Sequence, residues 1–212
     1  MAKSNLSETT LAELTKKLRV FSKYWQSCHL ECNESPLFSE FMSTIHKDIE
    51  AVSLDQFLKS PEFNKVYIFR HDLGYLEIYN DGFLVLMIMF LPDDYFLEFH
   101  DHPQMIVISK LLEGEMTLLQ CDLLEPELFY GKPRIPGSVF AGRNFSQVLQ
   151  KSNCVAELFP RKNNVHGLKS HKRSVVLDVV FNYYDENRPC SYFDALPDSN
   201  GSFSHLRFTK EE

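Results

Sequence analysis

The stretch from Val66 to Phe181 constrains the fold most, because it is a series of short segments rich in β-branched and aromatic residues. Asn80-Asp81-Gly82 separates two of these segments as the tight turn of a β-hairpin does. Short strands without helices between them predict a mainly β fold, either a sandwich or a small barrel. The expected strands cover residues 66–69, 75–79, 83–90, 95–100, 105–112, 115–123, 146–149, 155–158 and 174–181.

The first quarter of the chain has the periodicity of helices. Apolar residues recur at three- and four-residue steps over Thr10–Gln26 and again over Leu37–Ile49, a pattern typical of amphipathic helices. A shorter helix is expected at 54–58, and Pro61 then ends the helical run. We therefore expect α-helices at the N-terminus, before the β segments.

Length and composition favour a single elaborated domain. With 212 residues, of which 44% are hydrophobic, the chain can bury one full core. We expect a helical layer over residues 1–62, a barrel over 63–197 and a polar, loosely held tail over 198–212. The proline- and glycine-rich stretch Glu125–Gln147 is expected to be a surface loop of the barrel.

Charge and hydropathy exclude several partners. The net charge of −7 argues against binding to nucleic acid, which needs clustered lysine and arginine. Residues 1–8 lack the apolar core of a secretory signal, and the apolar run Phe83–Leu91 is far shorter than the roughly 20 residues of a membrane-spanning helix. We expect a cytoplasmic or nuclear protein without nucleic-acid or membrane partners, and monomer is the simplest expectation for its oligomeric state.

Five cysteines are scattered along the chain, namely Cys28, Cys32, Cys121, Cys154 and Cys190. An odd number without an export signal fits reduced thiols. Cys28 and Cys32 lie four residues apart on an expected helical segment and can reach one zinc ion, but no second pair follows them. Ordinary helix cysteines are the alternative interpretation of this pair.

His100-Asp101-His102 lies at the end of an expected strand and predicts a metal site. Side chains alternate between the two faces of a strand, so His100 and His102 project to the same side while Asp101 faces away. Two imidazoles on one face can bind one metal ion. The alternative is that these are surface histidines or hydrogen-bonded core histidines.

Two imidazoles alone hold divalent iron or zinc weakly, so a metal site needs a third ligand from a distant strand. His166 is the candidate, because its turn-rich segment lies between the expected strands 155–158 and 174–181 and could fold back over the barrel opening. His171 is close in sequence but stands beside two basic residues, and we expect it to be an exposed loop residue.

Several motifs follow one another along the chain: His100-Asp101-His102-Pro103-x-Met105, Ser109-Lys110-Leu111-Leu112-x-Gly114, Val165-His166, Leu177-Asp178-Val179 and Cys190-x-Tyr192. Together they resemble the thiol dioxygenases, the family that includes plant cysteine oxidases and animal cysteamine dioxygenase, over roughly Val66 to Phe193. The resemblance implies a cupin-type double-stranded β-helix, which is a jelly-roll barrel. It also implies a mononuclear non-haem iron, Fe(II), held by His100, His102 and His166.

The expected ligand set also makes chemical sense for thiol oxidation. Many cupins place a glutamate about five residues after the second histidine, and this chain has Val107 there. Three neutral imidazoles leave Fe(II) with its full charge and with open positions, which favours an anionic thiolate ligand. If a neighbouring amine also binds, a position remains for dioxygen, and the product is a sulfinic acid.

Asp178 interrupts an otherwise apolar strand, and burying it without a partner would cost several kcal/mol. The resemblance favours a functional contact to the substrate amine or to a ligand histidine, and a structural hydrogen bond to the backbone is the alternative. Related enzymes place a tyrosine six residues after this aspartate, following two prolines. The counterpart here is Tyr184, but the prolines are missing, so the choice between Tyr183 and Tyr184 stays open.

Two further positions concern the same resemblance. Cys190 and Tyr192 match the segment from which animal relatives form a thioether crosslink, and a packed cysteine beside an ordinary aromatic residue is the alternative. Gln104 stands where the family usually has glycine. A larger polar side chain there could narrow the site or supply a hydrogen bond, so substrate preference could differ from that of better-known relatives.

Together with these residues, the resemblance implies an Fe(II)-dependent cysteine or cysteamine dioxygenase that uses O2. The expected substrate is the N-terminal cysteine of a protein or peptide, or a small aminothiol such as cysteamine. For the first substrate, the resemblance implies oxygen sensing through an oxygen-dependent protein lifetime. The alternatives are a cupin oxygenase or isomerase acting on a non-thiol small molecule, and a non-catalytic cupin binding module.

Overall fold

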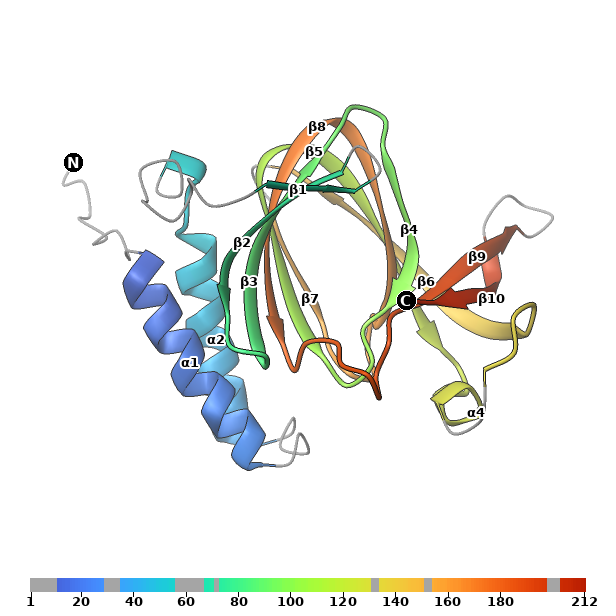
Figure 1. Cartoon of the computed structure of the whole chain (residues 1–212), viewed down its shortest axis with the longest axis horizontal. Coiled ribbons are helices and arrows are strands. Elements are labelled where there is room, and N and C mark those ends of the chain that lie inside the picture. Colours follow the sequence, from blue (N-terminus) through green and yellow to red (C-terminus); the bar gives the residue numbers. More distant parts are fainter. Residues whose placement is uncertain are drawn as a thin grey trace.

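The computed structural model describes residues 11–28, 35–55, 67–70, 73–130, 134–150, 154–197 and 203–212. Its helices are α1 (Leu11–Ser27), α2 (Pro36–Glu50) and α4 (Pro126–Tyr130). Its strands are β1 (Tyr67–Arg70), β2 (Leu73–Asn80), β3 (Leu84–Leu91), β4 (Phe96–Asp101), β5 (Ile106–Leu123), β6 (Val139–Leu149), β7 (Val155–Leu158), β8 (Val165–Phe181), β9 (Ser191–Pro197) and β10 (Phe203–Glu211). Figure 1 shows α1 and α2 on one side of a barrel, and an arm containing β9 and β10 on the other side.

Helices α1 and α2 form because each presents one apolar face to the barrel. The buried hydrophobic residues of these faces are Leu14, Leu18, Phe21, Trp25, Phe38, Met42, Ile45 and Ile49. They pack against the outward-facing apolar residues of β3, β5 and β8. Ser35 caps α2 by accepting a hydrogen bond from the Phe38 N–H at 3.0 Å, and Pro36 begins the helix. The two longer predicted helices are confirmed, and the helix predicted at 54–58 lies mostly outside the described residues.

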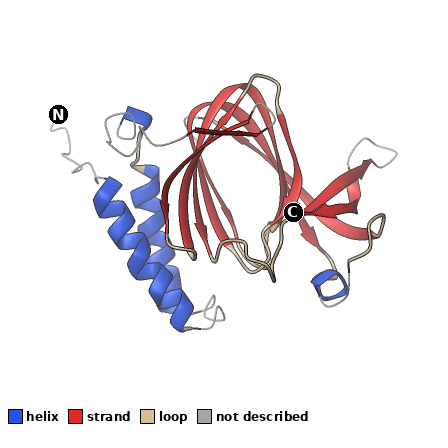
Figure 2. Cartoon of the chain, in the orientation of Figure 1, coloured by secondary structure: helices blue, strands red, loops and turns tan. Residues whose placement is uncertain are grey.

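The described strands form one antiparallel sheet that curls into a barrel, as Figure 2 shows in red. Their order is β1-β2-β3-β8-β4-β9-β10-β6-β5-β7, and β8 also pairs with β5. The first part of β8 pairs with β4 and its last part pairs with β3, so this strand arches from one wall of the barrel to the other. The predicted fold class, a mainly β, cupin-type barrel with N-terminal helices, is confirmed.

Strand β5 is continuous where the sequence predicts two strands, 105–112 and 115–123. The predicted break is a region of register shifts in the pairing between β5 and β8. Gly114 lies there with φ +99, and a Cβ at this position would overlap Ser174 and the Arg173 carbonyl. The glycine therefore marks a bulge inside a strand and not the end of one.

Two expectations for the C-terminal half are wrong. The stretch expected to be a surface loop, 125–147, contains α4 and most of β6, because its prolines and glycines mainly precede the strand. The tail expected to be loosely held contains β10, which pairs with β9 and β6. Leu206 and Phe208 are buried against residues such as Phe193, and this burial stabilises the strand. In the sequence, Leu206 and Phe208 alternate with polar residues, and this strand pattern was missed.

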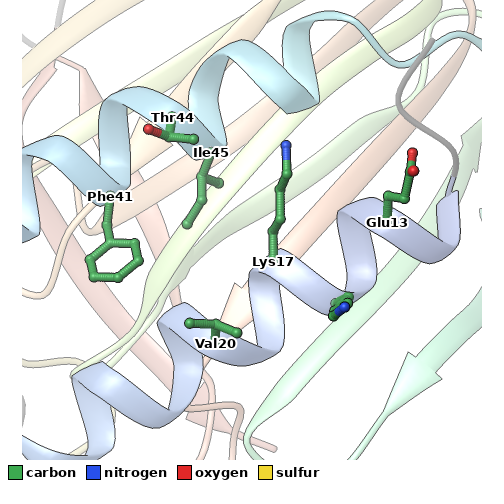
Figure 3. A pocket seen from close by; sticks show the side chains of 7 residues that line it. Glu13, Lys17, Val20, Phe41, Thr44 and Ile45 are labelled. Carbon is green, nitrogen blue, oxygen red and sulfur yellow. The ribbon is translucent and has the colours of Figure 1, made fainter. Parts of the chain in front are cut away.

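No helix among the described residues is long and apolar enough to cross a membrane. Figure 3 shows a surface groove between α1 and α2, lined by Glu13, Lys16, Lys17, Val20, Phe41, Thr44 and Ile45, none of which is a candidate site residue.

Cys28 has a free thiol, whereas Cys32 lies outside the described residues, so the predicted zinc pair is not tested.

Candidate metal centre

His100, His102 and His166 converge on one point. His100 on β4 and His166 on β8 are direct partners across an antiparallel strand pair, and His102 follows the end of β4. The Nε2 atom of His166 lies 3.0 Å from Nε2 of His102 and 3.0 Å from Nε2 of His100. Among the described residues, these three side chains are grouped closely enough to hold a metal ion.

His166 lies within a strand, which corrects the prediction that it belongs to a turn-rich segment. Strand β8 begins at Val165, earlier than predicted, and pairs His166 with His100 on one side and Gln120 on the other. The backbone of this histidine is therefore held in two ladders. His171 is exposed, as predicted, but it also lies in β8 and not in a loop, and its Nε2 is 2.7 Å from the Thr117 hydroxyl.

The three imidazoles are neutral, as metal ligands must be. Burial lowers the pKa of His100 to about 4. Burial, together with the neighbouring histidines, lowers the pKa of His102 and of His166 well below the ordinary value of 6.5. By accessible surface His102 and His166 are buried, whereas His100 is half-buried and is the most exposed of the three rings.

Hydrogen bonds at the outer nitrogens orient two of the three rings. Nδ1 of His100 donates to the Glu98 carbonyl at 2.8 Å. The Tyr184 hydroxyl donates to the Asp101 carbonyl at 2.6 Å and therefore accepts from Nδ1 of His102 at 3.0 Å. Both rings then carry their proton at Nδ1, which leaves the Nε2 lone pairs aimed at the common point. Nδ1 of His166 is buried without a hydrogen-bond partner.

This donor set fits a divalent transition metal. Nitrogen lone pairs that face one another repel, and a cation between them removes the repulsion. Two nitrogens bound at right angles to one ion, with bonds of about 2.1 Å, lie about 3.0 Å apart, the separation found around His166. No carboxylate joins the group in the described part of the chain, and Val107 is buried among apolar side chains. The residues therefore fit a metal held by three neutral nitrogens.

Tyr184 hydrogen-bonds to His102, one of the candidate ligands. Besides the hydrogen bond to His102, its ring lies beside the His102 ring, with 5.7 Å between the centroids. Burial raises the pKa of Tyr184 well above its usual value of 10.0, so the hydroxyl stays protonated. The Tyr183 ring packs against the Tyr184 ring, with 5.2 Å between the ring centroids. This contact favours Tyr184 as the residue that orients His102.

Asp178 is buried on β8, opposite Ser109 of β5. Burial raises the pKa of Asp178 to about 6, although the nearby Ser109 hydroxyl partly lowers it, and its Oδ1 atom has no hydrogen-bond partner. Leu168 and Val176 share an apolar cluster inside the barrel. His166 and Asp178 each lie two residues beyond them on the same strand, so both project into the same interior. No backbone hydrogen bond to Asp178 Oδ1 accounts for its burial, and its catalytic role stays a prediction.

Cys190 and Tyr192 both lie next to the histidines. Tyr192 on β9 is the partner of His100 across the β4–β9 pair, with 6.1 Å between the ring centroids. The Cys190 thiol donates to the Asp101 carbonyl at 3.9 Å. Burial raises the pKa of Cys190 to about 12, while the hydroxyls of Tyr184 and Tyr192 partly lower it. The thiol and the Tyr184 hydroxyl contact the same Asp101 carbonyl. The predicted Cys190–Tyr192 thioether stays a prediction.

A polar network on the opposite face of β4 was not predicted from the sequence. The Asp101 carboxylate accepts from the Ser191 N–H at 2.7 Å and from the Tyr130 hydroxyl at 3.1 Å. That hydroxyl also lies 3.1 Å from the Asn164 side-chain oxygen. Burial raises the pKa of Asp101 to about 7. Strand alternation turns Asp101 away from the histidines, and a carboxylate buried on that face needs hydrogen-bond donors. This pattern in the sequence could have predicted the network.

The model of the PCO_ADO family matches residues 43–212, a range that includes the three histidines, Asp178 and Tyr184. The chain belongs to the PCO_ADO family. The resemblance predicted from the ordered motifs is therefore confirmed at the level of the family.

Individual proteins that resemble this PCO_ADO family member have low sequence identity to it. A curated relative, the "Probable 2-aminoethanethiol dioxygenase" of Dictyostelium discoideum, is 29% identical over 153 residues, which cover 70% of this chain and 65% of the relative. Similar solved structures include an RmlC-like cupin from Shewanella frigidimarina, with a TM-score of 0.43 and 14% identity over 60% of this chain and 92% of the other. KdgF from Halomonas sp. has a TM-score of 0.39 and 12% identity over 58% of this chain and 92% of the other.

Gln104 has a left-handed backbone conformation, with φ +57. Its carbonyl accepts a hydrogen bond from the Asn182 side chain at 2.8 Å, which holds the turn after His102 in place. Glycine adopts this conformation without the steric penalty that a Cβ brings. The glycine usual in thiol dioxygenases at this position therefore has a conformational reason.

Replacing Gln104 with glycine is expected to stabilise the fold by about 0.5–1 kcal/mol, because relief of the left-handed strain outweighs the greater freedom of the unfolded chain. Denaturant unfolding at equilibrium measures this difference. Gln104→Ala is the matched control and should stay close to the parent protein, since alanine keeps the Cβ. A glycine variant no more stable than the alanine variant would show that the turn carries no strain.

Replacing Tyr184 with phenylalanine is expected to weaken metal binding by about 10- to 100-fold, because His102 loses the oxygen that accepts from its Nδ1. Anaerobic titration with Fe(II) against a competing chelator measures the affinity. Tyr183→Phe, one residue away, is the control and should bind metal as the parent does. Equal affinities in all three proteins would remove Tyr184 from the site.

Proposed function

We propose that this protein is an iron-dependent thiol dioxygenase that converts a thiol and O2 into a sulfinic acid. The observation that carries the proposal is the meeting of three neutral imidazoles inside a barrel of the PCO_ADO family, with no carboxylate from the described residues in the group. The cysteamine-type dioxygenase named among its relatives supports the same reaction class. In this reaction both atoms of O2 are added to the sulfur of one thiol, so no further reductant is needed.

The residues of this chain contribute to that reaction in separate ways. A bound Fe(II) would supply the binding of thiolate and the activation of dioxygen. His100, His102 and His166 would hold the ion without reducing its positive charge, which favours an anionic sulfur ligand. Tyr184 would orient His102 through their hydrogen bond, and the buried Asp178 carboxylate would pair with a positively charged group inside the barrel.

The proposed substrate is the N-terminal cysteine of a protein or peptide, or a small aminothiol such as cysteamine. Both carry a primary amine two carbons from the thiol, so an ammonium group enters the barrel together with the sulfur. A buried carboxylate such as Asp178 gains most from such a partner. For a protein substrate in the cytoplasm or nucleus, oxidation would make the lifetime of the target depend on oxygen. The proposed working unit is the monomer.

The test starts from protein loaded with Fe(II) without oxygen and mixed with a Cys-initiated peptide or with cysteamine. After air is admitted, mass spectrometry should find a gain of about 32 daltons on at least one thiol. An N-acetylated Cys peptide is the control, because it keeps the thiol and lacks the free amine. Turnover of an enol or a sugar but of no thiol would assign the protein to another cupin reaction, and absence of iron uptake would favour a non-catalytic binding module.

A further inference from the structure

The three candidate ligands differ in how their backbones are held. His100 and His166 are partners inside the β4–β8 ladder. His102 lies one residue beyond Asp101, where β4 ends, so it has left the ladder. A ligand at the frayed end of a strand can shift by the fractions of an ångström that decide metal affinity. His102 therefore needs another support for its main chain.

The Asn164 side chain supplies this support. Its Oδ1 atom accepts from the His102 N–H at 3.1 Å, and its Nδ2 atom donates to the His102 carbonyl at 2.9 Å. The ladder pairs His100 with His166 and Asp101 with Val165, so the next pair in this register is His102 with Asn164. The side-chain amide thus replaces a missing pair of backbone hydrogen bonds at the next register position.

The surroundings of Asn164 fix the orientation of its amide. The residue is buried, with 6% of its surface exposed. Oδ1 also lies 3.1 Å from the Tyr130 hydroxyl, and Nδ2 also donates to the Pro160 carbonyl at 3.0 Å. The His102 N–H faces the amide oxygen and two carbonyls face the amide nitrogen, so a flipped amide would lose these contacts.

We propose that Asn164 is a positioning residue of the metal centre. Asn164 fixes His102 relative to His166, which follows Asn164 by two residues and lies in β8. The inference rests on the metal site proposed above. Asn164 acts through His102, because both of its contacts to that ligand are with main-chain atoms. Its loss should therefore weaken metal binding without removing any donor atom.

Ser170 offers a matched control at the other end of β4. Phe96 begins β4 and pairs with Lys169, so the next register pair there is Tyr95 with Ser170. The buried Ser170 hydroxyl accepts from the Tyr95 N–H at 2.9 Å and lies 3.2 Å from the Tyr95 carbonyl. A side chain thus supports the main chain at each end of the strand, but only Asn164 supports a metal ligand.

The experiment compares Asn164→Ala and Ser170→Ala with the parent protein in anaerobic competition titrations with Fe(II), and with Co(II) as a spectroscopic probe. Asn164→Ala is expected to lose about 10- to 100-fold in metal affinity and to change the Co(II) absorption bands. Ser170→Ala is expected to bind as the parent does, even where its melting temperature falls as much. Parent-like affinity in Asn164→Ala, or an equal loss in both variants, would overturn the proposal.

A second measurement needs no variant and covers the case in which Asn164→Ala does not fold. Hydrogen exchange in the metal-free parent protein should find the His102 amide protected to within about tenfold of the amides inside the ladder. Exchange at the rate of an exposed loop amide would overturn the proposal. If the parent protein binds no metal at all, the proposed function fails as well. If the parent protein binds metal and Asn164→Ala binds it with the same affinity, only the inference about Asn164 fails.

Discussion

Replacing His166 with alanine is expected to abolish iron retention and thiol oxidation together. This ring is the central member of the group, with Nε2 only 3.0 Å from each of the other two Nε2 atoms. The remaining pair, His100 and His102, would face a labile divalent ion with two imidazoles, which hold it weakly. Metal analysis after desalting of the Fe(II)-loaded protein, with activity measured on the same sample, gives both quantities.

The matched control is His171→Ala, because His171 is an exposed histidine on the same strand. This variant should keep the parent's iron content and rate. His100→Ala and His102→Ala should behave as His166→Ala does. An iron-loaded, active His166→Ala protein would show that the three rings do not act as one ligand set.

Replacing Asp178 with asparagine is expected to change stability and activity in opposite directions. The pKa of Asp178 is raised by burial from 3.8 to about 6, so the folded protein binds the proton more tightly than the unfolded chain does. The carboxylate therefore destabilises the metal-free fold increasingly as pH rises from about 4 to about 6, and the loss stays constant above that range. Asparagine carries no charge and removes this destabilisation. The free energy of unfolding of the metal-free protein should therefore rise by up to about 3 kcal/mol at neutral pH. The same change should slow thiol oxidation by about 100-fold, with iron retained.

Denaturant unfolding of the metal-free proteins between pH 4 and pH 8 measures the first effect, and turnover of the iron-loaded proteins measures the second. Asp185→Asn is the control, because Arg188 lowers the pKa of this exposed carboxyl. Its substitution should bring no gain in stability and no change in turnover. A stabilised Asp178→Asn variant with the parent's turnover would return Asp178 to a merely structural position.

The sequence was informative wherever a local period decides which face a side chain occupies. Alternation placed His100 and His102 on the same side of the chain at the end of β4, and three- and four-residue steps located α1 and α2 within about one residue. The order of the motifs identified His166 as the third candidate metal ligand, even though the first part of β8, which contains it, was not predicted. A glycine was misread as a strand end, because sequence pattern does not distinguish a bulge at Gly114 from a turn.

The features that were missed depend on contacts between distant segments. Strand β10 is ordered by apolar residues that meet Phe129 and Phe193 only in the folded protein. Asn164 lies 62 residues from His102 in the chain, so its role follows from strand register and not from any local pattern. The choice between Tyr183 and Tyr184 was open for the same reason, because neither lies in a strand whose alternation would decide it.

The most direct measurement of the central claim is a reaction of the Fe(II)-loaded protein with an aminothiol under oxygen gas labelled with 18O. We expect a sulfinic acid product about 36 daltons heavier than the thiol, because both oxygen atoms come from one O2 molecule. The metal-free protein is expected to give no product under the same labelled gas. A product carrying one labelled atom or none, or equal product without iron, would contradict the assignment of thiol dioxygenation to the three histidines.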